Sequence, residues 1–517
     1  HLKPDGIMNI VLPHGVLFRG GEEGKIRKQL IEQNHIDAII GMPSGIFFGT
    51  GIPTIIIVLK QKRTNTDVLI IDASKGFVKE GKNNKLRASD IKRIADAVRD
   101  REPRPKFSRV VERDVIRANE YNLNIPRYVD SSPSAEKWDI YASMFGGIPV
   151  NEIDELNTYW EAFPDLREAL FQSTTEVNAK LKVDDIKESI TAHTNVSNFT
   201  SQFNEAFEDF EAYLNQRLLN QIAEVKISKE KTVLSNNIFK RLETIPLIDK
   251  YEAYQLLDDK WETINVDLEI LQTEGFNATR VVDANMVLKK KNGKDVEIQE
   301  GWKGRIMPFN LVQERYLIKE LEALTTKENR LVAITAEIEE LFEQCTEDEL
   351  EEETVNDAKT GFVNAKVIKE AKQIRADHKK AKTTITDAYE KKIIAVDDLI
   401  TEDKKLKKQV KDEQAALHML TKETIENLSD AQVNDLLEQK WIKPIVHSLH
   451  NLPSAMIDTL SRKLQLLAEK YATTYSNVAK DIKETENSLA GLLDDLTGNE
   501  HDIKALREFK NLLKTEA

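Results

Sequence analysis

Residues 38–59, AIIGMPSGIFFGTGIPTIIIVL, constrain the fold most strongly, because two apolar runs flank a glycine-rich aromatic hinge. The first run covers residues 38–41. The second, residues 52–59, holds four isoleucines, a valine and a leucine, interrupted only by Pro53 and Thr54. Such a run predicts a strand that is covered on both faces. About eight residues are too few to cross a bilayer, so the run belongs to a protein core.

The hinge itself contains Gly45, Gly49 and Gly51, which permit a positive φ or a close approach of two backbones. Phe47 and Phe48 lie among them. Two interpretations stand. The hinge is either a tight connection whose phenylalanines pack into the core, or an aromatic shelf beside a pocket for a planar ring.

The flanking sequence predicts an α/β domain. Residues 7–19 predict a strand that ends at Pro13, and residues 20–33 predict a helix with acidic residues in its first turn. Further strands are predicted at residues 35–40 and, after the hinge and its second apolar run, at residues 68–74. The succession of a strand, a helix and three strands favours an α/β sheet with antiparallel pairing at its end.

Four blocks, VLPHGVLFRGGEEGKIRKQLIE, IIGMPSGIFFGTGIPTIIIVLK, VLIIDAS and NEYNLNIPRYVD, together resemble the modification subunit of type I restriction-modification systems. With YWEAFPDLREALF (159–171), the resemblance extends to about residue 175. It implies the carboxy-terminal strands of a Rossmann-like methyltransferase sheet. The implied reaction moves a methyl group from S-adenosylmethionine to the exocyclic amine of adenine in DNA.

The chain departs from this family in one respect. The family's glycine-rich S-adenosylmethionine loop and its Asn-Pro-Pro-aromatic tetrapeptide precede the strand at residues 7–13, and neither occurs in this sequence. We therefore expect a truncated or incomplete carboxy-terminal part that is inactive alone, with its cofactor site upstream. The resemblance implies that Phe47, Phe48 and Thr50 form the wall of the target-base pocket, with Pro13 and Phe18 nearby.

Charge is unevenly spread along the chain. Residues 1–130 hold 23 Lys and Arg against 16 Asp and Glu, whereas the remaining 387 residues have a net charge of −21. The basic segment predicts contacts with DNA phosphates, which fix position without reading sequence. The candidates are Lys60, Lys62, Arg63, Arg104, Lys106 and Arg109. The alternative is an ordinary solvated surface, because acidic residues are interleaved with these bases.

Composition excludes several classes of protein. The single cysteine, Cys345, excludes a disulfide framework and a cysteine-rich zinc site, and it fits the reducing cytoplasm. The nine histidines are scattered, so the sequence predicts no metal site. No apolar stretch approaches about 18 residues, so we expect no contact with a membrane.

The resemblance and the local sequence pattern together predict five segments. Residues 279–305 carry Asn-Gly between two alternating runs, which predicts a β-hairpin through the positive φ of that turn. Lys289, Lys290 and Lys291 beside the turn either contact nucleic acid or protect an edge strand from pairing. The other segments are a methyltransferase part (1–130), a linker with a family block (131–175), a helical region (176–278) and a long helical arm with a small helical tip (306–517).

The arm carries two apolar stripes. Leu317, Leu324, Leu331 and Ile338 recur every seven residues, and a second stripe runs from Tyr471 to Leu496. We expect the stripes to pair as an antiparallel, coiled-coil-like hairpin, either as internal core or as a docking arm. The resemblance implies four partners: the specificity subunit, a second modification subunit, the restriction subunit and double-stranded DNA. Two functions remain open, a part of an enzyme and a non-enzymatic module that clamps the specificity subunit and DNA.

Overall fold

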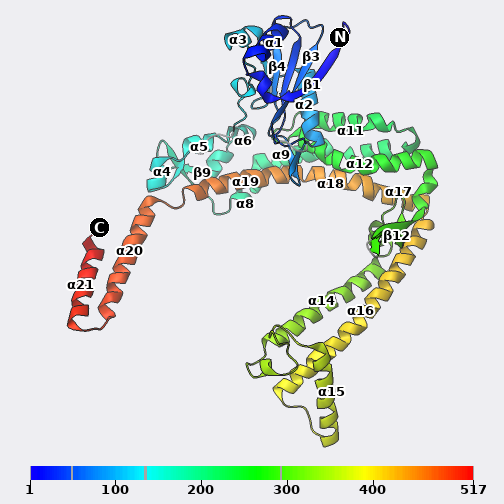
Figure 1. Ribbon diagram of the computed structural model, residues 1–517, viewed down its shortest axis with the longest axis vertical. Coiled ribbons are helices and arrows are strands. Elements are labelled where there is room, and N and C mark those ends of the chain that lie inside the picture. Colours follow the sequence, from blue (N-terminus) through cyan, green and yellow to red (C-terminus); the bar gives the residue numbers. More distant parts are fainter. Residues whose placement is uncertain (1, 48–50, 133–136, 292–293, 516–517) are drawn as a thin grey trace. The chain divides into compact units, whose positions relative to one another are not determined.

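The computed structural model describes residues 2–47, 51–132, 137–291 and 294–515 (Figure 1). The chain divides into two compact units. The first unit comprises residues 1–212, 228–262 and 445–517, and the second comprises residues 213–227 and 263–444. Each unit is therefore assembled from segments that are distant in the sequence.

A five-stranded sheet dominates the amino-terminal part of the first unit. Its order is β1-β3-β2-β4-β7, with bounds β1 (Ile7–Pro13), β2 (Ile36–Gly41), β3 (Thr54–Lys60), β4 (Val68–Asp72) and β7 (Ser108–Val111). β2 and β4 are parallel, and the other neighbours are antiparallel. The predicted α/β organisation is confirmed. The second apolar run becomes a strand only from Thr54, because Ile52 and Pro53 are exposed and belong to the hinge.

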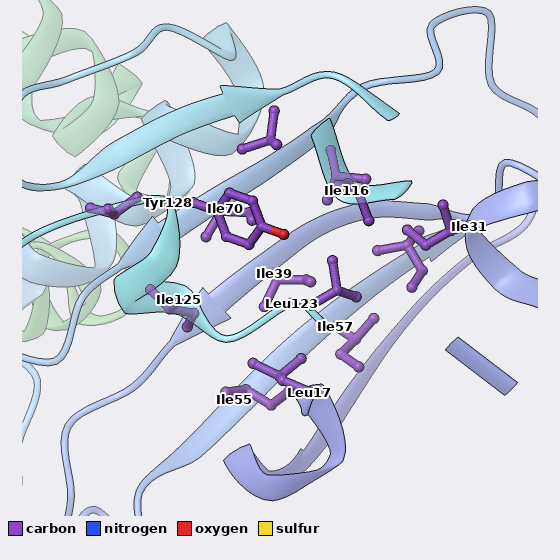
Figure 2. Packing of buried hydrophobic residues seen from close by; sticks show 14 residues of the cluster. Leu17, Ile31, Ile39, Ile55, Ile57, Ile70, Ile116, Leu123, Ile125 and Tyr128 are labelled. Carbon is purple, nitrogen blue, oxygen red and sulfur yellow. The ribbon is translucent and has the colours of Figure 1, made fainter. Parts of the chain in front are cut away.

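One face of this sheet is covered by four helical elements. The covering elements are η1 (His14–Leu17), α1 (Gly21–Glu32), α3 (Arg113–Ala118) and η2 (Ile125–Arg127). Figure 2 shows Ile39, Ile55, Ile57 and Ile70 of the strands among the side chains that these elements contribute. β2 is buried at every position, as a strand with both faces covered must be.

The opposite face packs against α2 (Ala88–Asp100), which contributes Ala97 and Ile94 to a second cluster around Ile40, Leu69 and Ile71. The other side of α2 contacts α11 (Ile227–Arg241) and α12 (Lys250–Glu274). The backbone N–H of Ser89 donates to Gln255 Oε1 at 2.9 Å. This hydrogen bond attaches α12 to α2, which packs on the sheet, although the two residues are more than 150 positions apart in the sequence.

The remainder of the first unit is a set of short helices with a small sheet of order β8-β10-β9. Lys470 at the end of α19 forms an ion pair of 2.8 Å with Glu152 of α5, which ties the carboxy-terminal helices to this set. The bounds are α4 (Ile140–Phe145), β8 (Ile148–Pro149), α5 (Val150–Asp154), α6 (Asn157–Ala162), α7 (Leu166–Leu170), β9 (Phe171–Ser173), β10 (Asn178–Leu181), α8 (Ile186–Ala192), α9 (Thr194–Phe207), α19 (Leu452–Lys470), α20 (Tyr475–Leu492) and α21 (Glu500–Thr515).

The second unit combines a two-stranded ribbon with long helices. Its elements are β11 (Val282–Lys291), β12 (Lys294–Gly304), α13 (Phe309–Tyr316), α14 (Ile318–Glu343), α15 (Asn364–Ala381), α16 (Ala388–Glu426) and α17 (Asp430–Leu437). The predicted hairpin is confirmed by the antiparallel pairing of β11 with β12, and its Asn-Gly turn lies outside the described residues. α17 begins at a capping box of Ser429 and Gln432. Helices α10 (Phe210–Leu214), α11, α12 and α18 (Lys443–His450) have residues in both units.

The predicted partner of the first apolar stripe is wrong. Leu317 and Leu324 pack against Val410 and Leu417 of α16, and Figure 1 shows α14 running beside α16. The second stripe lies mainly on α20, with Tyr471 directly after α19 and Leu496 beyond the end of α20. α20 packs against α4 and α21 of its own unit. A seven-residue period identifies a buried helix face but not its partner, which explains the error.

None of the helices in the described ranges combines the length and the apolar character that a membrane span requires.

Candidate functional site

The hinge connects the carboxyl end of β2 to the start of β3. Its two sides are joined where Met42 N donates to Thr54 O at 2.9 Å. A second hydrogen bond, from His14 N to Pro53 O at 3.2 Å, attaches the hinge to the segment that follows β1. The hinge therefore lies beside the end of the VLPHG segment.

A short ribbon, β5 (Val78–Glu80) with β6 (Asn83–Lys85), holds the first half of the hinge. Asn84 donates twice to it, from its backbone N to Gly45 O at 3.0 Å and from Nδ2 to Ser44 O at 2.7 Å. Gly45 has a φ of +66°, which glycine adopts without strain. The two hydrogen bonds from Asn84 thus fix the backbone position of Ser44 and Gly45.

The floor of the site is closely packed. A Cβ atom added to Gly41, the last residue of β2, would lie 2.6 Å from Ile125 Cδ1. At the end of the parallel neighbour β4, the buried Asp72 accepts a hydrogen bond from Ser74 N at 3.0 Å and another from Ser131 Oγ. These contacts fix the ends of the two central strands.

Of the predicted pocket residues, Phe47 is described and is 45% exposed, so it is not a core residue. Phe18 is likewise exposed and packs against His14 with ring centroids 5.5 Å apart. Pro13 is exposed at the end of β1. Phe48 and Thr50 lie outside the described residues. An uncovered apolar and aromatic surface therefore lies at this end of the sheet.

Three of the six predicted phosphate-binding residues lie away from the hinge. β3 starts at the hinge and ends at Lys60, so Lys60, Lys62 and Arg63 lie at the opposite end of that strand. Six residue steps of a strand span roughly 20 Å. The hinge and this basic group are therefore separate surfaces.

The prediction that Arg63 contacts DNA phosphates is wrong. Its side chain is 1% exposed, and its guanidinium donates to Asp37 Oδ1 at 3.0 Å and to Asn34 Oδ1 at 3.1 Å. Lys60 and Arg101 also pair with Asp37, at 2.8 Å and 3.0 Å. The lone aspartate in the apolar run HIDAII is the signal that was missed, because a buried carboxylate needs charged partners.

Arg104, Lys106 and Arg109 lie near the hinge end of β4, because Asp72 N donates to Phe107 O at 2.8 Å. Arg104 is engaged in structure, since its Nη1 donates to the hydroxyl of Tyr251 at 2.8 Å. Burial raises the pKa of that hydroxyl. Lys106 and Arg109 are exposed, so they are the members of this trio that face solvent.

Neither Asp72 nor the glycine-rich hinge fits S-adenosylmethionine. Asp72, the buried carboxylate at these strand ends, is already occupied by Ser74 and Ser131. The glycines of the hinge connect two strands, whereas a cofactor loop of the doubly wound fold connects a strand to a helix. In the described part of the chain, histidine, cysteine and acidic side chains form no cluster of metal-ligand geometry.

Residues 1–137, which contain the hinge, match the family model N-6 DNA Methylase. The resemblance to type I modification subunits is confirmed for this part of the chain. The methylase subunit of the type I restriction enzyme MpnII from Mycoplasma pneumoniae is 41% identical over 140 residues, covering 27% of this chain and 26% of the relative. The MjaVII methylase subunit from Methanocaldococcus jannaschii is 40% identical over 139 residues, covering 26% and 24%.

A solved type I methyltransferase subunit from Streptococcus thermophilus is 54% identical, covering 25% of this chain and 28% of that chain with a TM-score of 0.25. The chain thus matches about a quarter of the length of its curated methylase-subunit relatives.

Proposed function

We propose that this chain is part of the modification subunit of a type I restriction-modification system, acting in the cytoplasm. That subunit transfers a methyl group from S-adenosylmethionine to the exocyclic amine of adenine in DNA. The observation that carries the proposal is the match of residues 1–137, hinge included, to the N-6 DNA Methylase family.

The hinge contributes the wall of the target-base pocket. Chemistry on an exocyclic amine requires the base to leave the duplex and to be held against aromatic or apolar side chains. Phe47 is exposed and lies on a loop whose first half is fixed by Asn84. In our proposal Phe47, with Phe48 and Thr50, forms this wall, and Lys106 and Arg109 contact the DNA backbone nearby.

The exposed edge of β1 indicates where the cofactor-binding half attaches. β1 is an edge strand, and its residues Ile7 and Val11 are 60% and 49% exposed. A groove of about 770 Å³ beside it is lined mainly by apolar residues of β1, β3 and α2, among them Ile7, Ile56 and Ile94. An apolar edge of this kind requires cover. We propose that the segment with the glycine-rich loop and the Asn-Pro-Pro-aromatic tetrapeptide supplies it.

A second candidate function is assembly without chemistry. α20 presents Val478, Ile482 and Leu489 on one side of a hollow of about 310 Å³, and each is at least 40% exposed. Apolar residues at this spacing are typical of a helix that docks on another helix. In this proposal the helices beyond residue 150 clamp the specificity subunit, and a second modification subunit, the restriction subunit and double-stranded DNA complete the complex.

Methyl transfer from tritiated S-adenosylmethionine tests the first function. The full chain is assayed alone and joined to an upstream segment that carries the two missing motifs, with the specificity subunit and duplex DNA present. The joined protein should label adenine, the chain alone should not, and Phe47→Ala in the joined protein should reduce labelling. If the joined protein assembles with the specificity subunit but does not label adenine, the first function is contradicted and assembly is the function that stands.

A further inference from the structure

A polar pocket lies at the end of β3 that is farther from the hinge. It has a volume of about 560 Å³ and is lined by Lys60, Lys62, Asn34 and Asn65, with Asp37 and Arg63 at its base. The proposed methyl transfer assigns no role to this pocket, although Lys60 and Lys62 are among the residues whose charge predicts contacts with DNA phosphates.

Cations outnumber carboxylates around this pocket. Asp37 forms ion pairs with Lys60 at 2.8 Å, with Arg63 at 3.0 Å and with Arg101 at 3.0 Å. Asp67 forms an ion pair with Arg101 and a longer one, at 3.8 Å, with Arg63. Three cations thus share two carboxylates, which leaves one positive charge without compensation within the cluster.

Lys62 at the rim adds to this excess. Its side chain is 73% exposed, and its acidic neighbour is Asp5 at 3.8 Å, itself 90% exposed. An exposed pair at this distance is weak and screened by solvent. The Lys62 ammonium is therefore available to a ligand at the mouth of the pocket.

The base of the pocket is buried, which strengthens the electrostatic attraction between its charges and a ligand. The Arg63 side chain is 1% exposed, and burial, with the nearby Arg101 as a further cause, lowers the pKa of its guanidinium, while Asp37 opposes the effect. Electrostatic attraction is larger at such a site than at an open surface, because the effective dielectric constant is lower.

We infer that this pocket binds a phosphate group. Lysine binds phosphate as a point charge. Asn34 Nδ2 already donates to Asn65 O at 2.9 Å, whereas Asn65 Nδ2 donates one hydrogen bond, to Asp67 Oδ1 at 2.9 Å, and has a second N–H to offer a ligand. Asp37 does not repel the ligand strongly, because it is 2% exposed and paired with three cations. The phosphate belongs either to a nucleic-acid backbone or to a free phosphate compound, since both present the same group.

Two binding measurements at constant ionic strength test the inference and separate the sources. The first titrates the full chain with inorganic phosphate, followed by ³¹P NMR, and the second titrates a labelled duplex with the chain, followed by anisotropy. Lys62→Glu reverses the exposed charge at the rim, and Lys25→Glu makes the same change on α1, where Lys25 is 75% exposed. Circular dichroism checks that both variants fold.

Lys62→Glu should weaken phosphate binding about tenfold, a loss of about 1.4 kcal/mol, and Lys25→Glu should leave it unchanged. If the duplex loses affinity in the same variant, the ligand is a nucleic-acid backbone; if the duplex is unaffected, it is a free phosphate compound. Equal losses in both variants, or no binding of either probe, would overturn the site. Neither measurement requires methyl transfer, so failure of the proposed function is seen separately.

Lys60→Gln is a second variant that probes the inside of the pocket. The Lys60 side chain is 32% exposed, and Asp37 keeps Arg63 and Arg101 when Lys60 is neutralised. The variant should therefore fold and bind phosphate more weakly than the wild type. Undiminished binding in Lys60→Gln would contradict the placement of the ligand.

Discussion

The backbone N–H of Leu123 donates a hydrogen bond of 2.9 Å to the carbonyl oxygen of Leu17, and both side chains are buried in one cluster (Figure 2). The two residues belong to blocks more than 100 positions apart, VLPHGVLF and NEYNLNIP. Arg27 joins the same segments, because it donates to Tyr121 O at 3.2 Å and to Val16 O at 2.7 Å. The blocks that carry the resemblance are thus one packed structure.

Gly41→Ala should destabilise the first unit. The new Cβ would lie 2.6 Å from Ile125 Cδ1, so the isoleucine must move from its packed position. Overpacking of a core typically costs about 1–3 kcal/mol. Urea unfolding measures the change, and Gly51→Ala is the control because a Cβ there meets no atom within 4 Å. Equal stability of the two variants would contradict the close packing at the end of β2.

Asp37→Ala should destabilise the chain strongly. It leaves the buried Arg63 guanidinium without its carboxylate partner, and removing one member of a buried ion pair costs about 3–5 kcal/mol. Asp5→Ala, at a position 90% exposed, should change the free energy of unfolding by less than about 0.5 kcal/mol. A small effect of Asp37→Ala in urea unfolding would show that Arg63 reaches solvent.

The carboxyl group of Glu32 should make the stability of the fold depend on pH in the acidic range. Hydrogen bonds from Arg117 and then Tyr121 lower the pKa of its carboxyl from 4.5 to about 2. The stabilisation is therefore complete above about pH 4.5 and is lost as the pH falls toward 2.

The melting temperature of the wild type should exceed that of Glu32→Gln at pH 7, and this difference should shrink between pH 4.5 and pH 2. Thermal melts across that range measure it. Glu120→Gln, at an exposed position, serves as the control substitution. A difference that stays constant down to pH 2 would show that Glu32 is not held ionised by Arg117.

Leu324→Ala should weaken the helical pair of α14 and α16. Leu324 is 6% exposed and clusters with Val410 and Leu417, so its removal should cost about 2–5 kcal/mol in urea unfolding of the second unit. Val332→Ala on the same helix, at a position 70% exposed, should have little effect. If Val332→Ala were the more damaging change, the assigned buried face of α14 would be wrong.

The strands could be predicted from the sequence because their apolar runs and turn residues are local signals. β1, β2, β3 and β4 lie within two residues of their predicted positions. The hairpin of β11 and β12 was predictable for the same reason. The partner of α14 was not, since the stripe from Leu317 to Ile338 suits any apolar helix face of similar period.

The site was predictable only in part. The aromatic hinge was evident, and the exposure of Phe47 distinguishes a surface from a core residue, which spacing alone does not. Charge runs were misleading for Arg63, because whether an arginine faces DNA or a buried aspartate depends on tertiary contacts. The three cations around Asp37 lie up to 64 residues from it along the chain, and no sequence period connects them.

Calorimetry with S-adenosylmethionine is the most direct test of the proposal that this chain supplies the target-base side of a methyltransferase whose cofactor site lies on another segment. The chain is titrated alone and again when joined to an upstream segment that carries the glycine-rich loop and the Asn-Pro-Pro-aromatic tetrapeptide. We expect no heat of binding from the chain alone and saturable binding from the joined protein. Saturable binding by the chain alone would contradict the proposal, because it would place the cofactor site within these 517 residues.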